Sequence, residues 1–545
     1  MGERGEAIRR DAAWALALLV AAAGYGATCV YWSAHPFEDA AILMRYAKHV
    51  AEGHGIVWNV GEAPVDGATD FLFMVVVAAG ARLGGLVCGG GVSQVALVRG
   101  AVFAIAVGSA GLGVLAVYWG IRALHGSSRW VAAFSALYLA VGPALRYASG
   151  GFGTPFFALF VLGAWWLAYR LADGADEART ALGFALVCLG MGLTRPEGVF
   201  LALLMLAAVV YRRGWRGSRR AVFVFGAAFV VLGGAYFAWR WSYFGHPLPN
   251  PYYKKGGGAV HLDGLRSAVR YAAVFCLPFA PAFVAGLRRR DTAVETVFAL
   301  IPLAGFVGLW LLVSDEGNVF GRLQYAVVPL VLLSWPRLVR GLGREWRLPR
   351  LSELGPGARR SLVCVATLVA LMVLGYQHRV SRFPTRFRDG LYDVALMLRG
   401  YRDRGYTIAV TEAGLLPLYS QWRALDAWGL NDHHVAVHGL TEAHIDRYRP
   451  EVIQFHAYFS PLADLGRRDA WHAMCTTLKR YAESNGYVVA AIYGESPYDT
   501  HHYYVRPDFP HSEAIVRAIR GVDYSWMSSG RRCVNYALPL PPDER

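Results

Sequence analysis

Two adjacent carboxylates, Glu38 and Asp39, directly follow the first long apolar segment of the chain. A carboxylate in this position could act as a general base on an acceptor hydroxyl, provided that it reaches the proton. Asp39 also opens a stretch with helical periodicity, residues 40–52, which stops at Gly53. It could therefore cap that helix instead. Taken alone, capping is the more common role, and the two roles are compatible.

A second group of charges interrupts apolar sequence at residues 194–198 (TRPEG). Charged side chains at membrane depth are costly, and they usually pair with one another or face a cavity. Arg195 and Glu197 could therefore form an ion pair at the turn of a helical hairpin. The alternative is that Arg195 binds a phosphate.

Two further polar groups stand at the ends of apolar segments. In the first, Tyr252 precedes Lys254 and Lys255. An aromatic belt at the membrane interface accounts for the tyrosine, whereas the lysines suit an anionic headgroup. In the second, Arg322 could bind phosphate, and Asp315 could pair with a base or help to hold a divalent cation. A surface salt bridge would account equally well for either residue of the second group.

The elements that position these residues are membrane helices. Of the 545 residues, 55% are hydrophobic and only 17% are charged, which is too little charge to cover a soluble protein of this size. The first apolar run, after Arg9 and Arg10, indicates a signal anchor that remains as a membrane helix. We expect about eleven spans of bilayer length, at residues 13–31, 95–119, 130–147, 155–171, 181–193, 199–211, 221–241, 269–287, 294–313, 323–335 and 362–376.

Loop charges predict how these spans are oriented. The positive-inside rule assigns the arginine-rich loops to the cytoplasm: residues 4–10, 122–129, 212–220, 288–290 and 337–360. The loops that then lie outside are residues 35–70, 149–154, 195–197, 243–258 and 315–322. This division holds only if the apolar residues 71–81 do not cross the membrane. We therefore expect a re-entrant or interfacial helix there.

The net charge of +15 does not indicate a nucleic-acid partner. The arginines stand in short loops between apolar segments, where they set topology and contact anionic lipid headgroups of the bilayer. No RNA- or DNA-binding motif accompanies them. Five of the seven cysteines lie in or beside apolar segments without metal-ligand spacing, which is typical of small core residues.

The chain after the last span has a different pattern. Short β-like runs at residues 407–411, 451–455 and 487–493 alternate with polar helical stretches, which predicts a soluble α/β domain. We place the boundary between a membrane domain, residues 1–378, and this domain, residues 379–545. An odd number of crossings from a cytoplasmic N-terminus puts the domain outside. Cys475 and Cys533 could then form a disulfide or remain two buried thiols.

Several of these stretches resemble those of a known family. Residues 37–47 (FEDAAILMRYA), continuing through residues 52–62, look like the first outer loop of GT-C glycosyltransferases, and most of all that of the terminal arabinofuranosyltransferases of the mycobacterial cell wall. Supporting matches follow in order along most of the chain, at residues 193–198, 243–245, 247–250, 252–254, 412–414 and 426–432. The sequence departs from the family in three places. Glu38 replaces the first aspartate of an acidic pair, residues 151–154 (GFGT) lack a glutamate, and residues 67–70 read GATD.

The resemblance implies an inverting transferase, which moves a monosaccharide from a polyprenyl-phosphate donor to a glycan or glycoconjugate acceptor outside the membrane. Its first-loop catalytic carboxylate corresponds to Asp39, with Glu38 beside it. We assign the donor phosphate to Arg195, Lys254, Lys255, Arg322 and Tyr252. We assign the remaining substrate contacts to Arg45, His54, Trp58, Asn250, Asp315 and Glu197. No cofactor is certain, a divalent cation is left open, and the metal requirement is unknown.

Two other classes of function compete with an enzyme. A lipid or sugar transporter would distribute polar residues across the membrane midplane, whereas here they gather at one set of helix ends. A non-enzymatic envelope or flagellar assembly protein on the same fold stays open, because residues 151–154 lack the glutamate of the family's Gly-Leu-Glu-Thr motif. We therefore expect a multi-pass protein of the inner (plasma) membrane, with its active site and C-terminal domain extracytoplasmic.

Overall fold

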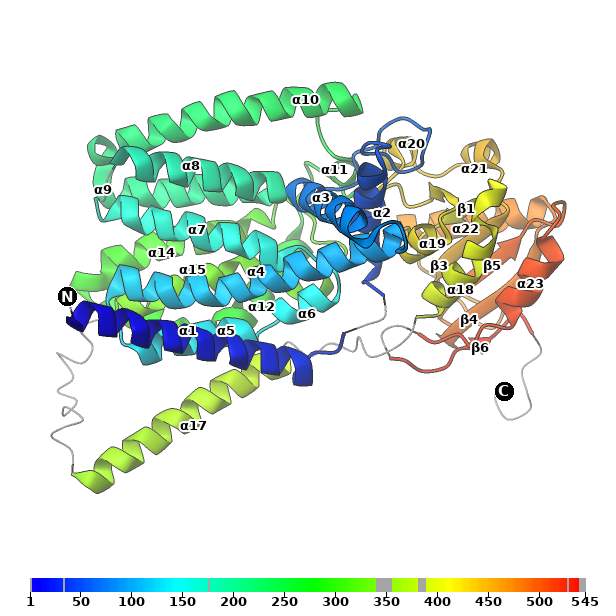
Figure 1. Cartoon of the computed structure of the whole chain (residues 1–545). Coiled ribbons are helices and arrows are strands. Elements are labelled where there is room, and N and C mark those ends of the chain that lie inside the picture. The colour runs from blue at the N-terminus through cyan, green and yellow to red at the C-terminus, as the bar shows by residue number, and fades with distance from the viewer. Residues whose placement is uncertain are drawn as a thin grey trace.

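The computed structural model describes residues 2–32, 35–174, 177–339, 355–380, 389–526 and 529–538. Helices form an elongated bundle in the N-terminal part, and a sheet with flanking helices forms the C-terminal part at one end of that bundle (Figure 1). The bundle consists of α1 (Gly2–Cys29), α2 (Glu38–Glu52), α3 (Phe71–Cys88), α4 (Gln94–His125), α5 (Arg129–Val141), α6 (Ala144–Ser149), α7 (Thr154–Ala172), α8 (Glu177–Thr194), α9 (Glu197–Ala228), α10 (Gly234–Phe244), α11 (Asn250–Lys254), α12 (Leu262–Cys276), α13 (Ala280–Arg288), α14 (Arg290–Leu309), α15 (Val327–Leu338) and α17 (Pro356–Val380).

Ten helical stretches of the described residues are long and apolar enough to cross a membrane. One of them, residues 197–244, contains two crossings, because Gly214 leaves helical geometry (φ 69°, ψ 167°) and the chain turns back there. A shorter apolar helix, Ala178–Thr194, packs along α7 and α9 within the bundle (Figure 1). The chain is thus a polytopic helical membrane protein, as its composition predicts. Most of the arginine-rich loop expected at residues 337–360 lies outside the described residues.

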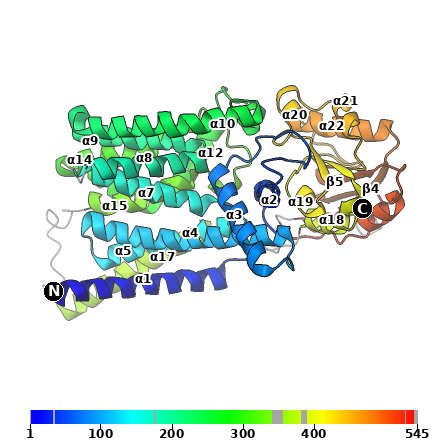
Figure 2. The same cartoon turned by 45° about the horizontal axis from the view of Figure 1, so that its top comes forward.

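Helix α3 contains the apolar segment that was expected not to cross. It has the length and composition of a span, but it lies at the end of the bundle nearest the C-terminal domain, beside α2 and the first turns of α4 (Figures 1 and 2). Gly80 and Gly84 allow the close approach, since a β-carbon at either position would come within 3.3 Å of Ala101 or Leu97. The chain therefore enters α4 from the same side on which it leaves α1.

The C-terminal domain is built on a sheet whose strand order is β2-β1-β3-β5-β4-β6. Strand β1 pairs in parallel with β2 and β3, and the remaining pairs are antiparallel. The domain consists of α18 (Gly390–Leu398), β1 (Thr407–Val410), α19 (Leu415–Ser420), β2 (Arg423–Asp426), α20 (His433–His438), α21 (Glu442–Tyr448), β3 (Val452–Ala457), α22 (Ala470–Ser484), β4 (Val488–Ser496), β5 (Asp499–Val505), α23 (Ser512–Arg520) and β6 (Val534–Asn535). The three β-like runs read from the sequence correspond to β1, β3 and β4.

The two faces of the sheet belong to different hydrophobic cores. Along β1, Ile408 and Val410 pack in one core while Ala409 packs in the other, because successive side chains of a strand point to opposite faces. The first core includes residues of α18, α19 and α23 and continues into α2, α3 and the start of α4. This shared core joins the C-terminal domain to the membrane bundle. Cys475 and Cys533 are both buried and both free thiols.

Candidate active site

All five loops expected on the outer side meet at the end of the bundle that carries the C-terminal domain. They enclose a cavity of about 130 Å³. We call it the loop cavity. Its lining residues are Asp39, Ala40, Ile42, Leu43, Gly67, Ala68, Thr69, Asp70, Phe73, Gly151, Phe152, Gly153, Arg195, Pro251, Lys255, Arg322 and Leu430. Residues from positions 39 to 430 thus surround one space, which contains both acids and bases.

Asp39 faces the loop cavity and is ion-paired there. Its Oδ2 accepts a hydrogen bond from Nη2 of Arg322 at 2.6 Å, and the side chain is 34% exposed. The guanidinium of Arg322 also lies over the ring of Phe152, 4.1 Å from its centroid. Asp39 does not cap α2, because the N-cap position is Phe37 and no side chain caps that end. The capping interpretation was therefore wrong, and Asp39 stands in the first turn, where its charge suits the helix dipole.

Arg195 forms the ion pair that the TRPEG sequence suggested and also lines the loop cavity. Its Nε donates to Oε1 of Glu197 at 2.6 Å, while Nη1 lies 3.7 Å from Oδ1 of Asp70. Asp70 was not among the assigned site residues. Burial raises the pKa of Asp70, although the charge of Arg195 acts against that rise. The pairing and phosphate-binding interpretations of Arg195 are therefore compatible in this geometry.

The two adjacent lysines point to different surroundings. Lys255 lines the loop cavity, and its Nζ donates to the backbone oxygen of Glu316 at 2.6 Å. Lys254 lies over the ring of Trp428 in the C-terminal domain, 3.7 Å from the centroid. Tyr252 is 42% exposed and does not line the loop cavity. Among the assigned phosphate ligands, the structure brings together Arg195, Lys255 and Arg322.

Glu38 turns away from Asp39 and toward the C-terminal domain. Its carboxylate accepts hydrogen bonds from the backbone N–H groups of Gly414 and Leu415, the latter at 3.0 Å to Oε2. Burial and the nearby charge of Glu412 raise the pKa of Glu38 well above its ordinary value. Gly414 is required at this contact, because a β-carbon there would collide with the backbone oxygen of Glu38. The two adjacent acids therefore have different environments.

Arg45 and Trp58 lie at the contact between α2 and the C-terminal domain rather than around the loop cavity. Arg45 is 4% exposed and donates to backbone oxygens of Trp58 and Trp422, each at 2.9 Å, and to that of Pro417. Trp58 donates from its indole N–H to the oxygen of Ala424 at 2.9 Å. Hydrogen bonds from both side chains therefore link the first outer loop to the C-terminal domain.

The other assigned substrate contacts are also spread out. Asn250 is buried, and its Oδ1 lies 2.9 Å from Nδ1 of His433. His54 has a 43% exposed side chain near the carboxylate of Glu52. Asp315 accepts from Nδ2 of Asn318 at 3.5 Å in the loop that carries Arg322. None of these three, nor Glu197, is among the residues that line the loop cavity.

An apolar groove of about 390 Å³ adjoins the loop cavity and shares Ala68 and Thr69 with it. We call it the helix groove. Hydrophobic side chains of α8, α9, α10 and the turn between the last two line most of its wall, among them Leu189, Leu193, Val199, Phe200, Phe229 and Phe237. Arg240 and Asp66 form an ion pair on its wall. The sequence analysis did not identify this groove, because apolar residues that line a groove look the same in sequence as those that face lipid.

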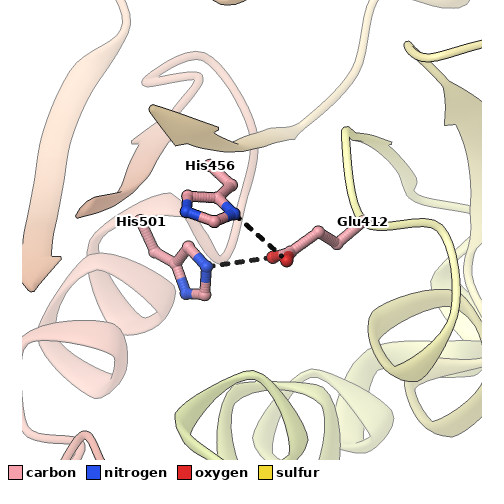
Figure 3. A group of neighbouring side chains, drawn as sticks. All are labelled: Glu412, His456 and His501. Carbon is pink, nitrogen blue, oxygen red and sulfur yellow. Dashed lines mark ion pairs between the residues drawn. The ribbon is translucent and has the colours of Figure 1, made fainter. Parts of the chain in front are cut away.

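Only one group of described residues has donors placed to hold a metal ion, and it lies outside the loop cavity. Glu412, His456 and His501 converge in the C-terminal domain (Figure 3). No local sequence motif predicted this group, because more than forty residues separate each of the three from the next along the chain.

Comparison with known proteins identifies the fold. ArnT from Cupriavidus metallidurans in the apo state has a TM-score of 0.56 at 16% identity, covering 92% of this chain and 98% of that one. ArnT bound to undecaprenyl phosphate has a TM-score of 0.52 at 14% identity, covering 90% of this chain and 98% of that one. An Archaeoglobus fulgidus oligosaccharyltransferase tethered with an acceptor peptide has a TM-score of 0.52 at 14% identity, covering 91% of this chain and 74% of that one.

Another similar structure is the arabinofuranosyltransferase AftD from Mycobacteria, with a TM-score of 0.50 at 14% identity, covering 92% of this chain and 40% of that one. These neighbours are GT-C glycosyltransferases, and the chain has their fold. A family model described as a domain of unknown function (DUF8728) matches residues 380–506. No curated protein matches the chain.

Proposed function

We propose that this chain is a membrane glycosyltransferase that uses a polyprenyl-phosphate sugar donor. The observation that carries the proposal is the loop cavity, where Asp39 and three cations converge next to an apolar groove. Solved structures with this fold include transferases of sugars, and one of them binds undecaprenyl phosphate. The donor sugar is a monosaccharide, arabinofuranose being the candidate from the resemblance, and the acceptor is an extracytoplasmic glycan or glycoconjugate.

The donor has two parts that suit two adjoining surfaces. A phosphate is stabilised by fixed cations, and Arg195, Lys255 and Arg322 all line the loop cavity. A polyprenyl chain is apolar and suits the helix groove, which is lined mainly by aliphatic and aromatic side chains. Because the two surfaces meet at Ala68 and Thr69, one donor molecule can occupy both.

The ion pair between Asp39 and Arg322 gives the site a way to couple donor binding to the availability of the Asp39 carboxylate. While Arg322 donates to Asp39 at 2.6 Å, Oδ2 of that carboxylate is occupied by this hydrogen bond. A donor phosphate competes for the same guanidinium. Once Arg322 turns to the phosphate, Asp39 is released to accept the proton of the acceptor hydroxyl.

The chemical step is a single displacement at the anomeric carbon, which inverts its configuration. Asp39 takes the proton of the acceptor hydroxyl while the acceptor oxygen forms the new glycosidic bond. The bond from the anomeric carbon to the phosphate oxygen breaks, and its electron pair leaves with the polyprenyl phosphate. The leaving group carries its own negative charge, so it needs the cations of the cavity and no proton donor.

Transfer of labelled sugar tests the function. Purified protein in proteoliposomes would receive polyprenyl-phosphate donors that carry labelled arabinofuranose, other pentoses or hexoses, together with envelope glycan as acceptor. We expect one of the donor sugars to place label in the glycan. The anomeric configuration of the new glycosidic bond should be opposite to that of the donor. A transporter would move labelled donor across the bilayer without joining it to glycan, and an assembly protein would do neither.

The orientation follows from the loop charges. We place the protein in the inner (plasma) membrane with the loop cavity and the C-terminal domain on the extracytoplasmic side. Both lie at the same end of the bundle, so a single orientation puts the two outside together (Figure 1).

A further inference from the structure

Glu412, His456 and His501 are brought together by the register of three neighbouring strands. Strands β1, β3 and β5 are adjacent in the sheet. His456 of β3 pairs directly with His501 of β5, so both imidazoles stand on the same face. Glu412 follows the end of β1, whose Val410 pairs with Gln454, and continuing that parallel register brings Glu412 level with His456. We call these three residues the sheet triad.

The distances within the sheet triad match those between ligands of one small cation. Nδ1 of His456 lies 3.3 Å from Oε1 of Glu412, and Nε2 of His501 lies 3.0 Å from Oε2 (Figure 3). The ligand atoms of all three residues lie within 4.8 Å of one another. A tetrahedral zinc ion with bonds of about 2.0–2.1 Å separates its ligand atoms by about 3.3 Å. An ion can therefore enter with small movements of side chains.

The outer nitrogen of each histidine is already held by another side chain. Nε2 of His456 lies 2.6 Å from Oδ1 of Asp499, and Nδ1 of His501 lies 2.6 Å from the hydroxyl of Tyr524. Histidines that ligate metals usually show this arrangement, in which a carboxylate or another polar group fixes the ring and its tautomer. The hydroxyl of Tyr524 is fixed in turn by that of Tyr503 at 2.9 Å.

This arrangement leaves the inner nitrogens facing a carboxylate. Nδ1 of His456 faces Oε1 of Glu412, while Nε2 of the same ring lies against Asp499. Nε2 of His501 and Oε2 of Glu412 are close but lack the alignment of a hydrogen bond, and neither has another partner among the described residues. Two imidazoles and one carboxylate therefore converge on one point.

We infer that the sheet triad binds a first-row divalent transition ion, with zinc as the best fit. Two imidazoles and one carboxylate are ligands that zinc favours, and three protein ligands leave a fourth position for water. The side chains of Glu412 and His456 are 21% and 16% exposed, so an ion can reach them from solvent. The inference does not depend on the proposed transferase activity. All three ligands lie within the matched domain of unknown function.

The ion also has a mechanical consequence. Glu412 begins the turn that presents the N–H groups of Gly414 and Leu415 to Glu38 of the first outer loop. By tying Glu412 to β3 and β5, the ion fixes this turn against the sheet. The ion thus stabilises the contact between the C-terminal domain and the first outer loop, and none of its ligands lines the loop cavity.

Metal content of the full-length protein tests the inference. The protein would be purified in detergent, incubated with zinc or with magnesium, desalted and analysed by mass spectrometry for metals. We expect about one zinc ion per chain to be retained, and no magnesium, because magnesium prefers oxygen ligands. In the triple variant Glu412→Gln, His456→Ala, His501→Ala, we expect zinc to fall at least about tenfold. His472→Ala, on α22 of the same domain, is the matched control.

Two milder variants distinguish loss of zinc binding from loss of folding. His456→Cys supplies another zinc ligand and should keep the ion. Asp499→Asn keeps all three ligands but changes the hydrogen-bond partner of His456 Nε2, and it should weaken zinc affinity about 10–100-fold. If the wild-type protein retained no more zinc than the triple variant, the sheet triad would be two histidine–glutamate ion pairs and the inference would be wrong. Equal zinc in the wild type and Asp499→Asn at every zinc concentration would equally contradict it.

Discussion

The loop cavity and the sheet triad both gather residues from distant parts of the chain, but by different means. The loop cavity takes its charges from helix ends and loops, such as Asp39 in the first turn of α2 and Arg322 in the loop before α15. The sheet triad takes its two histidines from the paired strands β3 and β5, and Glu412 from just beyond the end of β1. Loops can exchange partners when a ligand arrives, whereas paired strands hold their side chains in place. The first arrangement suits a reaction and the second suits a bound ion.

The loop cavity and the sheet triad also differ in how their charged groups are arranged. In the loop cavity each cation already has an acidic or carbonyl partner, as Arg322 has Asp39, so an arriving phosphate must compete for it. In the sheet triad two imidazoles and the carboxylate of Glu412 direct their ligand atoms toward one another, all within 4.8 Å. One region is prepared to receive an anion and the other a cation. The predictions that follow separate them, because each changes transfer while leaving zinc content as in the wild type.

The largest effect is expected for Asp39→Asn. This variant removes the proton acceptor, so transfer should fall about 10³-fold, while zinc content stays unchanged. Sugar transfer in proteoliposomes and metal analysis of the same preparation would measure both. Asp263→Asn is the control, because that carboxylate is 96% exposed and is not among the residues that line the loop cavity. Full activity of Asp39→Asn would remove Asp39 as the base.

Arg322→Gln should have the next largest effect. It removes the cation shared by Asp39 and the donor phosphate, so kcat/KM should fall about 10²-fold. The matched control is Arg266→Gln, an arginine that is 79% exposed. If the two variants lost activity equally, Arg322 would have no special part in the site.

Narrowing the helix groove should affect long donors selectively. Gly233 lines the groove, and a leucine there would project toward Leu189. Gly233→Leu should raise KM about tenfold for a decaprenyl donor, a loss of about 1.4 kcal/mol in binding, and leave KM for a farnesyl donor nearly unchanged. Gly226→Leu, where a β-carbon meets nothing within 4 Å, is the control. An equal rise in KM for both donors would place the lipid elsewhere.

The smallest effect is expected for Glu38→Gln. The amide oxygen can still accept from Gly414 or Leu415, so stability should fall by only about 1 kcal/mol and transfer by a few-fold. Thermal unfolding in detergent and the transfer assay would measure these changes. Loss of transfer as complete as in Asp39→Asn would show that the two acids share one task, contrary to their separate environments.

Parts of this arrangement could be predicted from the sequence because they depend on local patterns. Apolar runs predicted the spans, and alternating short runs predicted β1, β3 and β4. Loop charges placed Asp39, Arg195, Lys255 and Arg322 on one side of the membrane, and these four do line one cavity. The division of roles between Glu38 and Asp39 could not be predicted, because it depends on where Gly414 and Arg322 lie.

Arg45 and the sheet triad show where reasoning from sequence ends. Arg45 belongs to the stretch that resembles the family's first loop, but its guanidinium donates to backbone oxygens of Pro417 and Trp422. The sheet triad has no spacing signal, because its residues meet through pairing of strands that are distant in the chain. Strand register is set by the packing of both sheet faces, which no short motif records.

The sequence by itself determined the membrane character, which loops gather at one end of the bundle, and the presence of a C-terminal α/β domain. These follow from hydrophobic run length and loop charge, which act locally on each segment. The tertiary structure decided which acid faces the loop cavity, which cations accompany it and which histidines meet Glu412. Those outcomes depend on contacts between residues hundreds of positions apart, and only the packing of the bundle against the sheet brings such residues within a few ångströms.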